Sequence, residues 1–326
     1  MDTQAIVGLL KIIIMLFLFM IAGFIARKTG IINDTASKNL SKLVLAIGQP
    51  MMIVAALMGT ECSLENLGQG GIIVAIGFGL HIFMAAYAFV ACIKFKDLDE
   101  RKITEFALVF TNCGFIGLPI YEALFKNVGD FGRFWGAFYI ISFNVFLWTW
   151  GIAILARKRK DIKLTAKKIL LNYGTVPSAV GILIYILLIN VPGLYGSFAY
   201  DCVYGFCNSL GNLCTPISVL ITGALLATRT PKQIFGSPKV YYLCLQKLII
   251  MPLLICLIMK LLGFGPHYII FAVAATAMPT AASASMLSEL YDICPGHGSQ
   301  AVGTSSLLSM ASLPLVMLIT QAIVAL

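Results

Sequence analysis

Ten stretches of about 20 mostly apolar residues follow one another along this 326-residue chain, and each is long enough to cross a bilayer as a helix. Lipid offers no hydrogen bonds, so a segment that crosses it must satisfy its own backbone groups, which favours helices. Charged residues make up 11% of the chain, against about 25% in soluble domains. We therefore expect an all-α polytopic membrane protein with spans at residues 5–26, 37–58, 70–92, 103–125, 134–156, 169–190, 202–227, 239–262, 267–290 and 301–325.

Composition excludes several other classes of protein. The net charge of +9 comes from basic residues in short runs between apolar stretches, a pattern typical of cytoplasmic loops and not of nucleic-acid binding. The nine cysteines form no Cys-x-x-Cys pair, so we expect no metal site and no cofactor. The first stretch has its basic residues after it, at Arg27 and Lys28, which indicates a retained helix and not a cleaved signal peptide.

The distribution of Lys and Arg between the stretches predicts the orientation of the chain. Loops that follow odd-numbered stretches contain 18 of these residues, whereas the other loops and the end of the eighth stretch contain three. Basic residues near a membrane concentrate on its cytoplasmic side. We therefore predict a multi-pass protein of the cell membrane with cytoplasmic basic loops and both termini outside.

The basic loop at 157–168 divides the predicted spans into two sets of five, in residues 1–156 and 169–326. Five is an odd number, so the second set must enter the membrane in the opposite orientation to the first. Secondary carriers are often built from inverted repeats of this kind. The sequence thus predicts a 5+5 inverted repeat.

Interruptions of the apolar stretches fall at matching places in the two halves. Gln49–Pro50 in the second stretch corresponds to Thr215–Pro216 in the seventh. Gly117 to Pro119 in the fourth stretch corresponds to Pro279 in the ninth. Helices broken at corresponding positions of two halves point to a transport site near the middle of the membrane.

The chemistry of the breaks suits an anionic ligand. Pro119 lacks an amide proton and its ring displaces the carbonyl four residues earlier, which frees backbone groups in the apolar interior. Half-helix N-termini attract carboxylates, although each break could also be a structural kink, because proline is common in membrane helices. The predicted substrate-binding residues are Asn112, Gly114, Gly117, Pro119, Met278, Pro279, Thr280, Gln49, Pro50, Thr215 and Asn144.

Three further residues are candidates for coupling transport to an ion. Glu122 is the carboxylate nearest to a break, but a position at the outer rim of its span is the favoured interpretation. Lys247 lies inside a predicted span, where a charge indicates function by default. His81 and Asn144 have a simpler alternative, since polar residues often bond neighbouring helices. No aspartate falls in the core of a predicted span, so the sequence gives no sign of sodium coupling.

The stretch Thr111–Ile120 resembles the Gly-Asn-x-Gly-Phe-x-Gly-Leu-Pro motif of the auxin efflux carrier family, which includes bacterial permeases for malate, malonate and other organic acids. Thr111 stands where that motif has a glycine, so the resemblance does not predict the backbone conformation at this residue. Thr215–Ala227 resembles the family's seventh-span signature, Ala277–Ala281 its ninth-span crossover, and Ser309–Pro314 its last span.

This resemblance implies a ten-helix fold similar to sodium/proton antiporters and bile-acid symporters. In that fold spans 4 and 9 cross, and a transport domain moves against a scaffold of spans 1, 2, 6 and 7. Asn112, Pro119 and Pro279 match the positions at which family members hold a carboxylate. The long hydrophilic loop of plant carriers is replaced by the short loop at 157–168, as in a compact prokaryotic member.

We therefore expect a secondary transporter of a small organic anion, such as malate, malonate or an auxin-like acid, that works by alternating access about the crossing helices. A sodium- or proton-coupled symporter of the bile-acid type and a non-transporting membrane sensor or scaffold are the alternatives. The sequence contains none of the catalytic motifs of intramembrane enzymes. The expected partners are the organic anion and the lipid bilayer, and a homodimer is compatible with the sequence.

Overall fold

The computed structural model describes residues 3–126, 131–159, 171–172, 174–230, 234 and 236–326. Within these residues seven helices are long and apolar enough to cross a membrane, and two shorter apolar helices cover Thr175–Asn190 and Pro266–Ala277. The prediction of an all-α polytopic membrane protein is confirmed, whereas the ten-span inverted repeat stays a prediction. Residues 160–168 of the predicted basic loop lie outside the described residues.

The helices follow one another with short connections. In chain order they are α1 (Thr3–Lys28), α2 (Asp34–Leu43), α3 (Gln49–Met58), α4 (Leu64–Ala91), α5 (Leu98–Val109), α6 (Gly117–Phe125), α7 (Phe131–Phe146), α8 (Ile152–Leu155), α10 (Thr175–Asn190), α11 (Phe198–Gly211), α12 (Cys214–Ala227), α14 (Pro238–Leu245), α15 (Met251–Leu261), α16 (Pro266–Ala277), α17 (Ser283–Leu290) and α18 (Pro295–Ala325).

Short π-helical turns join three pairs of these helices into continuous rods. They are η1 (Val44–Gly48) before α3, η2 (Leu147–Gly151) before α8 and η4 (Gln246–Ile250) before α15. Pro50 and Pro252 follow η1 and η4 directly, each as the second residue of the next helix. Because a proline ring displaces the carbonyl one turn earlier, the wider π-turn accommodates it without breaking the helix.

Side-chain caps fix where two of the helices begin. The Ser63 hydroxyl accepts a hydrogen bond from the amide of Asn66 at 3.1 Å, so α4 begins at Leu64, earlier than the predicted residue 70. The Asp97 carboxylate caps α5 by accepting from the amides of Glu100 and Asp99. These bonds to backbone amides, that of Glu100 first, hold the pKa of Asp97 below its usual value.

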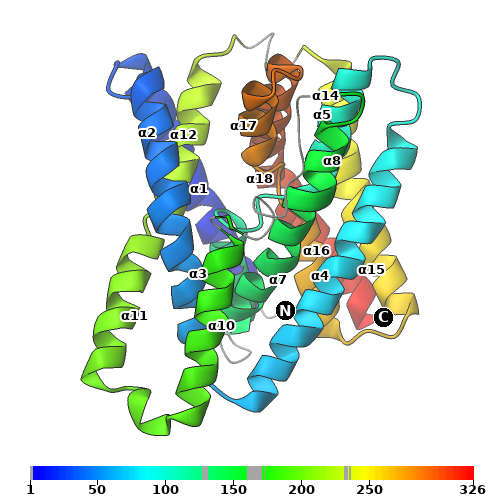
Figure 1. Cartoon of the computed structure of the whole chain (residues 1–326). Coiled ribbons are helices and arrows are strands. Elements are labelled where there is room, and N and C mark those ends of the chain that lie inside the picture. Colours follow the sequence, from blue (N-terminus) through cyan, green and yellow to red (C-terminus); the bar gives the residue numbers. More distant parts are fainter. Residues whose placement is uncertain (1–2, 127–130, 160–170, 173, 231–233, 235) are drawn as a thin grey trace.

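In Figure 1, α2, α5 and α14 all begin at the upper end of the bundle, next to the connections that contain many of the basic residues. α4 and α12 run up to the same end. These basic connections therefore lie at one end of the bundle, while the assignment of that end to the cytoplasm stays a prediction.

Two glycines bring α1 and α12 into close contact. A Cβ atom added at Gly223 would lie 1.9 Å from the carbonyl oxygen of Met20, and one added at Gly23 would lie 2.0 Å from that of Leu220. Small residues allow membrane helices to approach until their backbones touch, and packing is what holds such helices together.

Gly223→Ala is expected to lower the thermal stability of the purified protein, because the added methyl group must push α1 away from α12. Overpacking of this kind typically costs about 1–3 kcal/mol. Gly71→Ala on α4 is the matched control, since a Cβ there meets nothing within 4 Å. Equal melting temperatures for the two variants in detergent would contradict the close packing of α1 and α12.

Candidate functional site

The two predicted breaks meet in the middle of the bundle. The chain between α5 and α6 runs antiparallel to the chain between α16 and α17, with a bridge between Thr111 and Thr280. The amide of Asn112 donates to the carbonyl of Pro279 at 2.8 Å. Thr111 and Thr280 are fully buried, at 1% and 0% exposure. Irregular backbone at this place therefore satisfies part of its hydrogen bonding across the crossing.

Pro119 acts on the backbone as its chemistry predicts. It is the third residue of α6, and the carbonyl four residues earlier, that of Phe115, makes no bond within that helix. The hydroxyl of Thr215 on α12 donates to this carbonyl at 2.7 Å. Thr215, predicted from the seventh apolar stretch, is thus tied to the break in the fourth.

A cavity of about 260 Å³ lies beside this contact. Residues of α1, α3, α6, α7, α11 and α12 line it, together with the connection between α11 and α12. Three predicted site residues belong to the lining, Pro119, Thr215 and Glu122. The cavity reaches the surface of the protein at Glu122, whose side chain is 53% exposed.

The polar lining includes Arg133, which the sequence interpretation counted only as a loop charge. Arg133 is the third residue of α7, and its guanidinium donates to Asn208 at 3.4 Å and to Asn212 at 3.2 Å. Its Nε lies 3.7 Å from a carboxylate oxygen of Glu122. Because the predicted span began at residue 134, Arg133 was placed in the adjoining loop.

The side chain of Asn112 remains available to a ligand. Asn112 is 8% exposed, and its carboxamide has no hydrogen-bond partner among the described residues. Neighbouring backbone amides are already bonded: Gly117 donates to the carbonyl of Asn112 at 3.0 Å, and Thr280 donates to the hydroxyl of Ser305 at 3.0 Å. Its polar atoms are not among the fully buried unpaired ones, and Asn112 does not itself line the cavity.

Lys247 lies on η4 and is completely buried. Its Nζ donates to the carbonyl of Leu108 at 2.9 Å and to that of Phe110 at 3.4 Å. Both carbonyls belong to the end of α5, where the chain becomes extended. Lys247 therefore binds the crossing directly, although it does not line the cavity.

His81 and Asn144 are buried elsewhere. Nδ1 of His81 lies 2.7 Å from the carbonyl of Gly77 one turn earlier, and its ring stacks on Phe146 at 5.2 Å. Asn144 donates to the carbonyl of Ile140 at 3.0 Å and packs against the backbone at the start of α10. Neither residue lines the cavity.

The remaining predicted substrate residues surround the crossing without lining the cavity. Gln49 and Pro50 begin α3 directly after the contact between η1 and α12, where a Cβ on Gly48 would meet Cys214 at 2.6 Å. The others, in the two broken segments or directly beside them, are Gly114, Gly117, Met278, Pro279 and Thr280.

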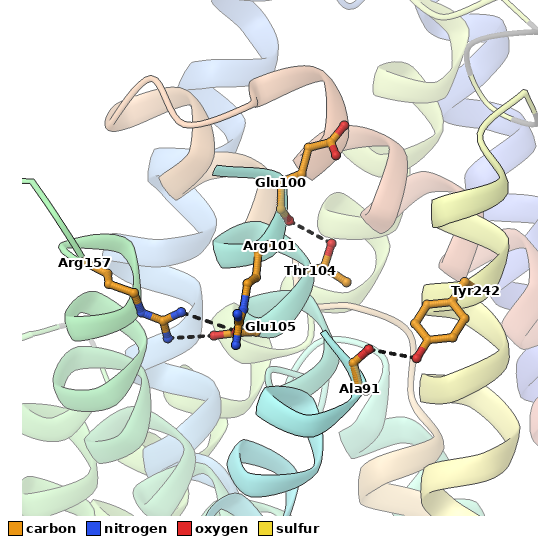
Figure 2. Close-up of polar contacts among 7 residues, drawn as sticks. All are labelled: Ala91, Glu100, Arg101, Thr104, Glu105, Arg157 and Tyr242. Carbon is orange, nitrogen blue, oxygen red and sulfur yellow. Dashed lines mark hydrogen bonds and ion pairs between the residues drawn. The ribbon is translucent and has the colours of Figure 1, made fainter. Parts of the chain in front are cut away.

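The middle of α5 is anchored by ion pairs to the buried carboxylate of Glu105 (Figure 2). Arg101 and Arg157 both converge on the carboxylate of Glu105, at 2.6 Å and 2.8 Å. The hydroxyl of Thr104 lies 2.8 Å from Nε2 of His297, which ties the same helix to α18. α5 is thus held along its length as well as at its end.

No group of His, Cys, Asp and Glu in the described part of the chain is arranged to hold a metal ion. A model of the family described as "Membrane transport protein" matches residues 9–317. No curated protein matches the chain.

Proposed function

The chain belongs to the auxin efflux carrier family of membrane transport proteins, and from this premise we propose that it is a secondary transporter of a small organic anion such as malate or malonate. Transport proceeds by alternating access about the crossing of the two broken helices. Residues 1–156 and 169–326 form the two halves of a ten-span inverted repeat, and the basic loops face the cytoplasm across the cell membrane.

The observation that supports this proposal best is the cavity beside the crossing. Its volume of about 260 Å³ falls below the roughly 300–1,000 Å³ of sites for drug-sized ligands. A cavity of this size favours a small substrate such as a short-chain dicarboxylate.

The position of the cavity also indicates which side it faces. α5 begins at the upper end of the bundle in Figure 1, and α6, which lines the cavity, packs on the first turns of α1, where a Cβ on Gly8 would lie 3.8 Å from Ala123. With basic loops in the cytoplasm, this state opens outward. The substrate then crosses when the crossing segments move past α12 and α1.

Uptake of radiolabelled malate, malonate, lactate and indole-3-acetate into proteoliposomes tests the proposal. Asn112→Ala is expected to reduce uptake about tenfold or more, since the anion must pass the crossing and loses there the hydrogen bonds that the carboxamide would make to it during translocation. Asn190→Ala is the matched control, because Asn190 bonds only to its own helix at an exposed end of α10.

Unchanged uptake by Asn112→Ala, with the wild-type melting temperature, would rule out Asn112 as a ligand-binding residue. If the wild type takes up none of the four acids, the proposal of a small-carboxylate carrier is wrong.

A further inference from the structure

The guanidinium of Arg133 has binding capacity that the protein does not use. Arginine presents five N–H donors in a planar fork, and two of its nitrogens here make single, long bonds to the amides of Asn208 and Asn212. Its Nε is buried and makes no hydrogen bond, since the oxygen of Glu122 is 3.7 Å away. The fork is thus oriented by neutral amides and only weakly paired with a carboxylate.

Backbone amides near the cavity are a poor alternative to Arg133 for binding an anion, because several of them already donate within the protein. The amides of Gly117 and Leu118 in the first turn of α6 donate within the broken segment, at 3.0 Å and 3.1 Å. Across the crossing, the amides of Asn112 and Ala281 bond to the opposite strand of backbone. A carboxylate that enters the cavity therefore needs a charged side chain, and Arg133 is the cation among the described lining residues.

We propose that Arg133 is the anion-selecting residue of this carrier and binds the carboxylate of its substrate through the guanidinium fork. Asn208 and Asn212 orient the fork, and the incoming carboxylate replaces Glu122 as its acidic neighbour. The inference rests on the proposed function and names the residue that makes the cavity specific for organic anions. Arginine suits this role because its fork matches the geometry of a carboxylate.

Glu122 provides a second test, because the proposal predicts the direction in which its substitution changes substrate binding. Its carboxylate competes with the substrate for the same guanidinium, since the two acidic groups cannot both approach it closely without repulsion. Removing the charge of Glu122 should therefore tighten binding, whereas removing the charge of Arg133 should weaken it. If the pair of Arg133 and Glu122 only stabilised the fold, both substitutions would lower stability and would not change substrate binding in opposite directions.

The experiment measures KM and kcat for labelled malate and malonate in proteoliposomes, with the melting temperature of each variant. Arg133→Gln is expected to raise KM about tenfold or more, because a charged hydrogen bond to the substrate is lost. Arg133→Lys keeps the positive charge without the guanidinium fork, so its KM should lie between those of wild type and Arg133→Gln. Glu122→Gln should lower KM several-fold. Arg27→Gln, which removes an arginine paired with exposed Asp34 outside the cavity, should behave as wild type.

A KM for Arg133→Gln within about twofold of wild type, at equal stability, overturns the inference. So does a Glu122→Gln variant whose KM rises. Wild-type uptake with a normal Arg133→Gln variant refutes only this inference, whereas absence of wild-type uptake refutes the proposed function. If the wild type shows no uptake, the rise in melting temperature on adding malonate is compared between wild type and Arg133→Lys. Equal shifts for the two proteins overturn the inference.

Discussion

Lys247→Met lowers kcat for carboxylate transport about tenfold or more and leaves KM within about twofold of wild type, if the crossing is held as the structure indicates. Methionine keeps the length and apolar stem of the side chain but cannot donate to the carbonyls of Leu108 and Phe110. The carbonyl of Phe110 still accepts from the amide of Ala281 at 2.9 Å, but the buried carbonyl of Leu108 loses its side-chain donor, which costs about 1–3 kcal/mol. The cost falls on the crossing and not on the cavity, so translocation slows while substrate binding persists.

Lys260→Met is the matched control for this substitution. Lys260 lies on α15, in the same rod as Lys247, and also donates to a backbone carbonyl, that of Ile323 on α18. Its contact lies at the far end of the rod from the crossing, so its loss should leave kcat unchanged. A normal kcat for Lys247→Met, or an equal loss for both variants, would contradict the role of Lys247 in positioning the crossing.

The contacts of Lys247 also bear on sodium coupling. In many carriers, unwound carbonyls and the C-terminal ends of half-helices coordinate the coupling cation. Here the amine of Lys247 bonds to the carbonyls of that kind at the end of α5. Uptake by the wild type should therefore proceed equally in sodium and in choline buffers. A strict requirement for sodium would favour a symporter of the bile-acid type instead.

The breaks were predictable from sequence because proline and glycine act on the backbone locally. The consequence of Pro119 for the carbonyl of Phe115 follows from one residue's geometry, and the structure shows that carbonyl bonded from outside the helix, by Thr215. Thr111, which replaces a glycine of the family motif, lies in an extended bridge. A β-branched residue is at ease in extended backbone, so the substitution leaves the crossing intact.

The cavity could not be predicted in the same way, because distant segments form it. Arg133 meets Asn208 and Asn212 across 75 and 79 residues of chain, and nothing local to Arg133 marks it as a cavity residue. The amides at the half-helix ends were expected to attract the anion, yet several of them bond inside the protein. Sequence reasoning identified where the backbone is irregular, while side-chain placement required the fold.

Glu105→Gln should destabilise the protein more than the other substitutions considered, because it leaves two arginines without their shared carboxylate. Glu105 is 0% exposed, and Arg101 and Arg157 are 17% and 32% exposed. Removing one partner from a buried ion pair costs about 3–5 kcal/mol, since the remaining charge stays desolvated. The partial exposure of the arginines places the expected loss at the lower end of that range.

The measurement is the half-life of the folded protein in detergent at a fixed elevated temperature, since membrane proteins of this size tend to unfold irreversibly. Asp34→Asn is the matched control: Asp34 pairs with Arg27 at the same 2.6 Å, but its side chain is 83% exposed, and exposed pairs contribute at most about 1 kcal/mol. A shorter half-life for Glu105→Gln alone shows that burial gives this ion pair its effect. Because Glu105 anchors the middle of α5 and Lys247 holds its end, the same variant should also slow transport. Equal half-lives for the two variants would mean that the ion pairs of Glu105 in Figure 2 do not stabilise α5.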